Sequence, residues 1–272
     1  METLKSILGI IGGFVLALNS HTVNYTYTEA ESLDQEVIIG QRYEIVEEVT
    51  LEKIKPIEGR TTAPSATGSW WTYPAKIQMC TRNGDDLLVL VNKEYKLPQS
   101  YAPTDLVSAS LSGIRKGSGY YLRKIIINDL KNLVTDAKAD GIDLSIRSGY
   151  RSYATQISTY NYWLNINGGS ISATDKISAR AGHSQHQLGT TVDFSSAEIA
   201  DGLGGSFSST EASKWLAKNA WKYGFVISYP SGYESITRYS YESWHYRYIG
   251  KANAQEMINN GMILELYLRS KN

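Results

Sequence analysis

The chain has a single cysteine, Cys80, among its 272 residues. No internal disulfide can form, so the folded state has to be held together by a buried hydrophobic core. Hydrophobic residues make up 42% of the chain and charged residues 20%, which is enough apolar material for such a core and argues against wholesale disorder. One cysteine also excludes a cysteine-rich zinc site, so any bound metal must be held by histidine and carboxylate side chains.

The balance of charge argues against nucleic acid as a partner. Lysine plus arginine and aspartate plus glutamate each number 27. A chain without net charge has no basic field that would gather a polyanion. We therefore expect no nucleic-acid partner, and we expect the protein to act as a monomer.

The hydrophobic pattern mixes helices and strands. The predicted strands, which show apolar runs or alternation, lie at residues 87–91, 142–147, 225–229 and 244–249. The predicted helices lie at residues 121–139, 208–223 and 252–260. The first of these ends at Asp140-Gly141, and the second begins with a Ser208-x-x-Glu211 capping box. Because helices and strands do not alternate regularly, the predicted class is α+β.

The N-terminal region differs in composition from the rest of the chain. An apolar run from Ile7 to Leu18 would rise roughly 18 Å as a helix, which is short of the ~30 Å hydrocarbon core of a bilayer. Residues 1–20 are therefore predicted to be a secretory signal. An uncleaved membrane anchor stays open, because Leu18 stands where a small residue is wanted if cleavage follows Ser20.

The polar stretch that follows predicts a stalk. Residues 21–81 show no helical or strand period, and we predict a linker that is partly disordered. Residues 82–272 are predicted to form the compact domain. We expect a secreted protein or one held in the cell envelope, with contact to a membrane only through the N-terminal segment.

Three of the four histidines fall in two short segments, residues 182–193 and 242–245. A catalytic zinc needs three protein ligands and one open position. His186, Asp193 and His245 supply two imidazoles and one carboxylate. If residues 190–194 and 244–249 are neighbouring strands, Asp193 and His245 point toward one place, and His186 reaches it from the preceding loop.

Such a site also needs a carboxylate that is not a metal ligand, to accept a proton from water and pass it on. Glu242, three residues before His245, is the candidate. In a regular strand these two side chains would point to opposite faces, so the hypothesis requires a turn around Ser243. Each residue taken alone is more often structural, and only the joint arrangement indicates catalysis.

Residues 184–193 (Ser-Gln-His-Gln-Leu-Gly-Thr-Thr-Val-Asp) and 242–245 (Glu-Ser-Trp-His) resemble the signature of the VanY-type D-alanyl-D-alanine carboxypeptidases of peptidase family M15. That family belongs to the wider group of lysostaphin, D-Ala-D-Ala metallopeptidases and hedgehog-like domains. Residues 148–152 (Ser-Gly-Tyr-Arg-Ser) and 86–93 resemble further blocks of the same family. The resemblance covers roughly residues 82 to 265.

The resemblance implies a small central, mainly antiparallel sheet flanked by helices, in an α+β domain. It also implies that His186, Asp193 and His245 bind Zn²⁺ and that Glu242 is the catalytic base. Arg151 would bind a substrate carboxylate or stabilise the oxyanion. Other residues of the matching blocks would contact substrate or orient the site, namely Tyr150, Ser152, Gln156, Ser184 and Trp244.

The expected activity is removal of the terminal D-alanine from peptidoglycan stem peptides. L,D-carboxypeptidase or endopeptidase action on the same stems stays open, as does a non-catalytic hedgehog-like domain that binds metal or peptidoglycan. Thr191 stands where the family usually has alanine, which puts fine specificity in question. His183 is an additional imidazole, which we expect to be a solvated loop residue.

Overall fold

The computed structural model describes residues 7–11, 14–19, 22–26 and 69–272. The apolar N-terminal run, for which a leader is predicted, contributes strands β1 (Ile7–Ile11) and β2 (Phe14–Asn19), which pair antiparallel. β3 (Thr22–Thr26) pairs with β2. Most of the predicted linker lies outside the described residues. Within the described ranges, no helix combines the length and the hydrophobicity needed to cross a membrane.

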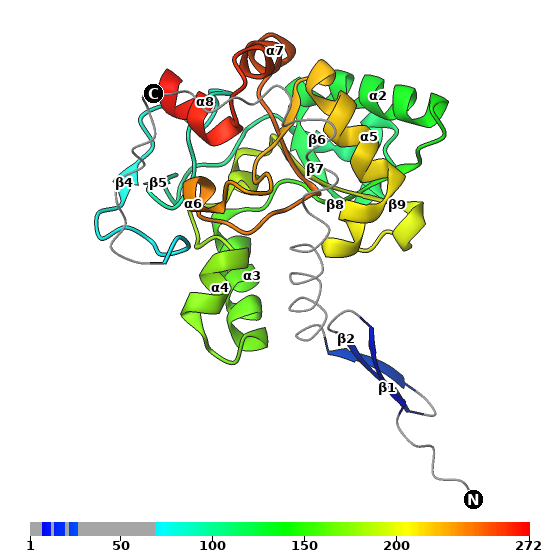
Figure 1. Ribbon diagram of the computed structural model, residues 1–272. Coiled ribbons are helices and arrows are strands. Elements are labelled where there is room, and N and C mark those ends of the chain that lie inside the picture. Colours follow the sequence, from blue (N-terminus) through cyan, green and yellow to red (C-terminus); the bar gives the residue numbers. More distant parts are fainter. Residues whose placement is uncertain (1–6, 12–13, 20–21, 27–68) are drawn as a thin grey trace, which may run out of the picture.

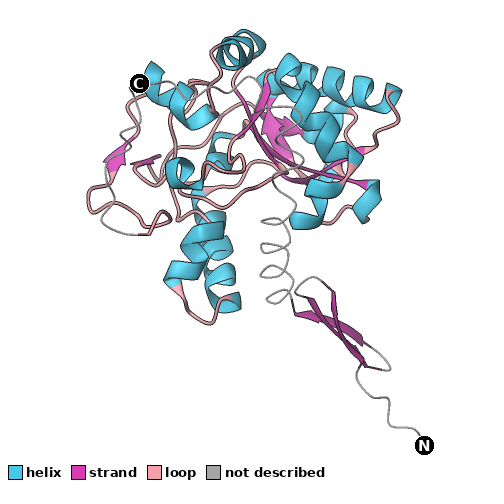
Figure 2. Ribbon diagram, viewed as in Figure 1, coloured by secondary structure: helices cyan, strands magenta, loops and turns pink. Residues whose placement is uncertain are grey.

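The centre of the domain is a four-stranded sheet, coloured magenta in Figure 2. Its strand order is β10-β11-β9-β8, and every neighbouring pair is antiparallel. The four strands are β8 (Leu144–Ser148), β9 (Thr191–Ser196), β10 (Phe225–Ile227) and β11 (His245–Tyr248). This small antiparallel sheet with flanking helices confirms the predicted fold class.

The main core lies between this sheet and two helices, α2 (Lys124–Ala139) and α5 (Glu211–Asn219) (Figure 1). α2 buries five side chains at helical spacing, and Phe194 and Tyr246 from the sheet belong to the same cluster. Full burial of one such aliphatic side chain stabilises the fold by about 1.5–3 kcal/mol. The alternation of the strands therefore sends Val192 and Phe194 into the core and leaves Thr191 and Asp193 on the other face of β9.

The remaining elements surround the sheet. Helices α3 (Tyr153–Ile166) and α4 (Ile171–Ile177) lie side by side and project from the body of the domain in Figure 1. A second apolar cluster involves the last two helices, α7 (Lys251–Asn259) and α8 (Leu264–Lys271). Short elements complete the domain: β4 (Gln78–Met79), β5 (Tyr95–Lys96), β6 (Leu106–Ser108), β7 (Tyr121–Arg123) and α6 (Glu234–Thr237).

The strand predicted at residues 87–91 is wrong. This segment is largely buried, but its backbone forms turns and irregular structure. The Asp86 side chain accepts a hydrogen bond from the Leu88 amide and bends the chain. The fully buried Arg247 donates to the carbonyls of Leu87 and Val89, both at 3.0 Å. A buried guanidinium thus satisfies carbonyl groups that a strand would have paired with a neighbouring strand.

The predicted capping box of α5 names the wrong N-cap residue, Ser208. Thr210 is the N-cap, and its Oγ1 accepts from the Ser213 amide at 3.0 Å. Ser208 lies in a preceding 3-10 helix and donates to the Gly205 carbonyl. Because that 3-10 helix occupies residues 205–209, the α-helix begins two residues later than Ser208 would have required.

The compact domain extends further toward the N-terminus than residue 82. β4 pairs with β5, and the Trp71 indole donates to the Ser172 hydroxyl of α4 at 2.8 Å. The Tyr73 hydroxyl group forms hydrogen bonds with two distant parts of the chain, the Arg180 amide and the Tyr239 hydroxyl. Residues 69–81 of the predicted linker therefore pack on the domain.

Candidate metal centre and active site

The sheet places two of the candidate residues on adjacent strands. Asp193 lies on the central strand β9, directly opposite His245 of β11. On its other side, Asp193 is in register with Ser148 of β8, next to an irregularity in the pairing of the two strands. The face of β9 that does not enter the core therefore presents a carboxylate between two neighbouring strands, as the alternation of the sequence predicts.

His186 comes from the segment just before β9. It lies in the 3-10 helix η3 (Gln185–Leu188), whose N-cap is Ser184. The Ser184 hydroxyl accepts from the His186 amide at 3.3 Å, and Gly189 ends the turn with φ +68°. A left-handed residue at this point suits glycine and reverses the chain into β9. Ser184 thus fixes the backbone that carries His186, which agrees with the orienting role expected for it.

These three side chains converge in one buried cluster. His186 Nε2 lies 3.2 Å from Asp193 Oδ2, and His245 Nδ1 lies 3.1 Å from Asp193 Oδ1. One ligand atom from each residue lies within 4.8 Å of the other two. The exposed fractions of these three residues are only 3–5%, so the cluster is shielded from bulk water. The sequence prediction of this grouping agrees with the geometry.

The outward nitrogens of both imidazoles are engaged by oxygen atoms. His186 Nδ1 lies 2.7 Å from the Gly149 carbonyl, which can only accept, so Nδ1 carries the hydrogen. His245 Nε2 lies 3.2 Å from Gln185 Oε1, which likewise accepts. In the neutral rings, the lone pairs of His186 Nε2 and His245 Nδ1 therefore face the Asp193 carboxylate. Lone pairs that face a carboxylate at about 3 Å repel it unless a cation lies between them, so the donor set fits a metal ion.

The electrostatics of the cluster favour the deprotonated forms that bind metal. Burial lowers the pKa of His186 to about 4, and Asp193 only partly opposes this effect. Burial alone would raise the pKa of Asp193, but the charge and hydrogen bonds that His186 and His245 supply when they are protonated in acid outweigh it and hold the pKa of this carboxyl below its usual range. Neutral imidazoles and an ionised carboxylate are the states that metal coordination needs.

Glu242 lies beside this cluster because the chain turns before β11. Residues 243 and 244 form a turn, and the His245 amide donates to the Glu242 carbonyl at 3.4 Å. As a result Glu242 Oε2 comes within 3.3 Å of His245 Nδ1. This turn at Ser243 is the backbone feature that the sequence hypothesis required, and it is confirmed.

Arg151 reaches the same place from the loop after β8. Its backbone amide donates to the His186 carbonyl at 3.1 Å, which ties the loop to η3. Among the described residues, its buried Nε has no hydrogen-bond partner. Burial lowers the pKa of the guanidinium, while Asp193 and Glu242 oppose that shift. Arg151 is thus a half-buried cation near two carboxylates, with its buried Nε available for a further acceptor.

The candidate site borders a cavity of about 110 Å³. It is lined by the three clustered residues, Arg151 and Glu242, and also by Gln156, Ser184 and Trp244, which were predicted to contact substrate. Tyr150 and Ser152, two other residues predicted to contact substrate, do not line this cavity. The Ser152 hydroxyl instead caps α3 by accepting from the Thr155 amide at 3.1 Å. A serine at a helix start is recruited by the unpaired amides of the first turn.

Several residues in or next to the cavity escaped the sequence analysis. Gln185 holds His245 Nε2, and its Oε1 also accepts from the Ser228 hydroxyl at 2.7 Å. The Tyr229 ring packs against the His245 imidazole at 4.8 Å between centroids. Tyr239 lies 4.8 Å from Tyr229 and also lines the cavity. The position of Gln185 next to a candidate ligand was a usable signal. Tyr229 was instead placed at the end of the predicted strand 225–229, although β10 ends at Ile227, and Tyr239 lies in a loop without periodicity.

His183 is buried, contrary to the solvated position expected for it. It is 3% exposed, and its Nδ1 lies 2.7 Å from the Asn92 carbonyl. Burial lowers the pKa of His183 to about 4. The expected solvated loop was wrong because residues 92–97 fold over this segment and supply a backbone acceptor for the ring.

His183 should make the fold sensitive to acid. As the pH falls below about 6.5, the unfolded chain takes up a proton at this imidazole while the folded chain does not, so folding stability is lost. Between pH 7 and 4.5 this group should cost about 2–3 kcal/mol of unfolding free energy. His183→Gln should remove that part of the pH dependence. Urea unfolding of both proteins at the two pH values measures the difference. An equal change in unfolding free energy with pH in both proteins would show that His183 is not the group responsible.

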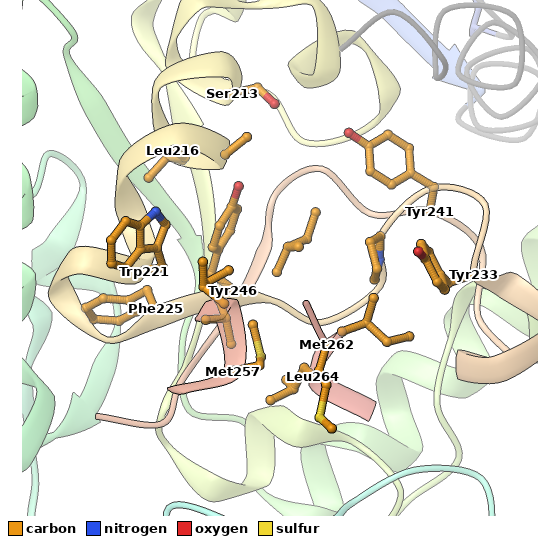
Figure 3. Close-up of a pocket in the computed structure, with 16 residues that line it drawn as sticks. Ser213, Leu216, Trp221, Phe225, Tyr233, Tyr241, Tyr246, Met257, Met262 and Leu264 are labelled. Carbon is orange, nitrogen blue, oxygen red and sulfur yellow. The ribbon is translucent and has the colours of Figure 1, made fainter. Parts of the chain in front are cut away.

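A second cavity, of about 60 Å³, lies on the other side of the segment that follows β10. Figure 3 shows Met257, Met262 and Leu264 gathered there with Phe225 and Tyr246. Its lining is almost wholly apolar and includes no histidine or carboxylate. Of these two cavities, only the first is lined by groups that can bind a metal or transfer a proton.

Comparison with known proteins points to one family. A family model described as D-alanyl-D-alanine carboxypeptidase, VanY, matches residues 119–251. Putative carboxypeptidase YodJ of Bacillus subtilis (strain 168) is 40% identical over 188 residues, which cover 68% of each chain.

Two solved structures share the fold at substantial identity. The LdcB LD-carboxypeptidase, solved to explain peptidoglycan recognition, has a TM-score of 0.64 and 35% identity, and the match covers 74% of this chain and 95% of that one. A mutant of the vancomycin-resistance D,D-pentapeptidase VanY from a VanB-type cassette, in complex with Zn(II), has a TM-score of 0.55 and 29% identity. That match covers 66% of this chain and 98% of the other.

Proposed function

Because this chain belongs to the VanY family of D-alanyl-D-alanine carboxypeptidases, a family of metallopeptidases, we propose that it is a zinc-dependent carboxypeptidase that removes the terminal D-alanine from peptidoglycan stem peptides. One observation carries the proposal. His186, His245 and Asp193 present three ligand atoms within 4.8 Å of one another, in a cavity that Glu242 and Arg151 also line.

His186 Nε2, His245 Nδ1 and the Asp193 carboxylate would hold the zinc ion. Two histidines and one carboxylate are a known ligand set of catalytic zinc, and the fourth position is left for water or substrate. A zinc ion in this set would lower the pKa of water toward ~7 and polarise the scissile carbonyl group. Gly149 and Gln185 would keep both rings in the tautomers that bind metal. The Zn(II) complex of the related D,D-pentapeptidase supports the choice of metal.

Glu242 would act as the general base. Its carboxylate lies next to the ligand cluster, with Oε2 3.3 Å from His245 Nδ1, and its side chain keeps 13% exposure toward the cavity. From there it would accept a proton from the attacking water and deliver it to the nitrogen of the leaving D-alanine. Both transfers occur within reach of one carboxylate, so no second acid is required.

Arg151 would bind the free carboxylate at the C-terminus of the stem. A guanidinium is charged at every physiological pH and can grip a carboxylate with two parallel hydrogen bonds. Because Arg151 lies in the cavity wall with its buried Nε unpaired among the described residues, an incoming carboxylate would satisfy a donor that the fold leaves open. This contact would make the enzyme a carboxypeptidase, since an internal peptide bond offers no such charge.

Arg151→Met should remove this selectivity while keeping the volume of the side chain. Loss of one partner of a charged pair in a cavity wall costs about 2–5 kcal/mol, so kcat/KM on a free-acid stem should fall roughly 30- to 5000-fold. The wild type should prefer the free acid over the same stem with an amidated C-terminus, and the variant should not. Rates on both stems provide the measurement. A variant that kept the preference would show that another group binds the carboxylate.

L,D-carboxypeptidase action is the second candidate, and the likeness to the LdcB LD-carboxypeptidase supports it. It uses the same zinc, base and carboxylate contact, and differs in the residue that precedes the scissile bond. A domain that only binds peptidoglycan would have no need of Glu242 and Arg151 in the cavity wall, and we do not favour it.

The test is digestion of defined stems by the purified, zinc-loaded protein. Synthetic stems that end in D-Ala-D-Ala, in a single D-Ala, or in a longer cross-bridged peptide are incubated separately and the products are weighed by mass spectrometry. Loss of one alanine from the first stem alone is the expected result, and chelation of zinc should abolish it. Loss of alanine from the second stem alone would replace D,D- by L,D-specificity. No product from any stem would overturn the proposal.

A location in the cell envelope or outside the cell follows from the proposed substrate, since peptidoglycan is assembled and trimmed there. The apolar N-terminal segment, as a cleaved signal or a retained anchor, would deliver the domain to that compartment. Fractionation of cells and N-terminal sequencing of the mature protein would test this part.

A further inference from the structure

A short segment in front of the family match is packed against residues that line or adjoin the active-site cavity. We call residues 69–73 the N-terminal arm. Trp71 anchors it, because its indole donates to Ser172 of α4 at 2.8 Å and the Lys176 ammonium lies 4.0 Å from its ring centre. The family model begins only at residue 119, so the arm is not part of it.

Tyr73, at the end of the arm, holds two parts of the chain with one hydroxyl group. Its oxygen accepts from the Arg180 backbone amide at 2.9 Å and lies 3.3 Å from the hydroxyl oxygen of Tyr239. The Arg180 guanidinium stacks on the Tyr73 ring at 4.2 Å, and the His183 ring meets it edge-on at 4.9 Å. Tyr73 is therefore fixed in position on both its face and its edge.

A buried lysine, Lys93, also contacts both the arm and Tyr239. Lys93 is 1% exposed, and its Nζ donates to the carbonyls of Trp71, at 2.8 Å, and Asp175. The same nitrogen lies 4.2 Å from the ring centre of Tyr239 and 5.2 Å from that of Tyr73. Lys93 thus links the arm, α4 and Tyr239 through one polar atom.

Both partners of the Tyr73 hydroxyl belong to, or adjoin, the wall of the cavity. Tyr239 lines it, and so do Ser178 and Ala179, which immediately precede Arg180. Gln156, a further lining residue, donates to the Ala179 carbonyl at 2.6 Å. From Tyr239 the contacts continue through Tyr229 to the His245 imidazole. Two side chains, Tyr239 and Tyr229, thus connect the arm to the catalytic cluster.

We propose that the N-terminal arm contributes to substrate binding. Tyr73 is a positioning residue that holds Tyr239 and the Ser178–Arg180 segment in the positions needed to bind the stem peptide. The inference rests on the proposed peptidase function and extends it to a region in front of the family match. It acts on substrate binding and leaves zinc binding alone, since Tyr73 contacts none of the three ligand residues in the described structure.

The test is Tyr73→Phe, which keeps the ring and its contacts and removes only the hydroxyl group. Loss of a buried hydrogen bond and an unpaired Arg180 amide should lower kcat/KM on the preferred stem by about tenfold, mostly through KM. Zinc content should not change. Tyr267→Phe is the matched control, because the Tyr267 hydroxyl also bonds two side chains, Asn253 and Glu256, but lies on α8 away from the cavity. Its kinetic constants should equal those of the wild type.

A double-mutant cycle with Tyr239→Phe tests whether Tyr73 influences kcat/KM through Tyr239. If Tyr73 acts through Tyr239, the double variant should lose less in kcat/KM than the product of the two single losses. Unchanged KM in Tyr73→Phe, or an equal rise in KM in Tyr267→Phe, would overturn the inference even if the wild type cleaves stems. A wild type that cleaves no stem would instead refute the proposed function, so the two failures are distinguishable.

Discussion

Replacement of Glu242 by glutamine should lower kcat on the preferred stem by about 10²- to 10⁴-fold while zinc stays bound. Glutamine keeps the shape of the side chain and its place beside His245, but its amide cannot accept a proton at neutral pH. The Glu242 carboxylate is the general base that we propose in the cavity, next to the ligand cluster. Steady-state kinetics and metal content of the same preparation give the two required numbers.

The matched control for this variant is Glu256→Gln. Glu256 accepts hydrogen bonds from Tyr267 and Lys271 on α8, far from the cavity lining. It reports what the loss of one surface carboxylate does to the fold, and its kcat should not change. Full turnover by Glu242→Gln would mean that the proton leaves by another route. Loss of zinc in that variant would show that Glu242 acts as a ligand.

The sequence predicts the catalytic cluster well because strand geometry is strict. Once Thr191–Phe194 and His245–Tyr248 are recognised as strands, the period of two decides that Asp193 and His245 point away from the core. The turn at Ser243 follows from the requirement that Glu242 reach the same point. Local rules were sufficient at these positions, since the residues lie on or next to regular strands.

The parts that escaped prediction depend on contacts between distant segments. Residues 87–91 have the composition of a strand, but Arg247 supplies donors from 158 residues away to one of their carbonyls. α3 was missed because its one buried residue is the polar Gln156, so it has no apolar stripe to detect. Tyr73 contacts Tyr239, a residue of the cavity wall, from 166 positions earlier in the sequence. No window of sequence contains these pairs.

Zinc should stabilise the wild-type domain by a large amount. A ligand present at about 1000 times its dissociation constant adds ~4 kcal/mol to the free energy of unfolding. For a domain of this size that corresponds to a rise in Tm of roughly 8–16 °C. Thermal unfolding with added zinc and with a chelator measures the difference. A shift of less than about one degree, with zinc confirmed absent before its addition, would contradict a site of high affinity.

Asp193→Asn should abolish this stabilisation by zinc. In the absence of metal, however, the substitution should not destabilise the domain. In the zinc-free wild type, the ionised Asp193 carboxylate faces the lone pairs of His186 Nε2 and His245 Nδ1 at 3.2 and 3.1 Å. The amide of asparagine carries no charge and can donate its own hydrogens to one of these nitrogens. The repulsion is then replaced by a hydrogen bond worth about 1 kcal/mol, so the variant should be at least as stable as the zinc-free wild type. A residue that served only to support the fold would give the reverse order, with the variant less stable in both conditions. The comparison in chelator therefore separates a carboxylate placed to bind metal from one placed to stabilise the sheet.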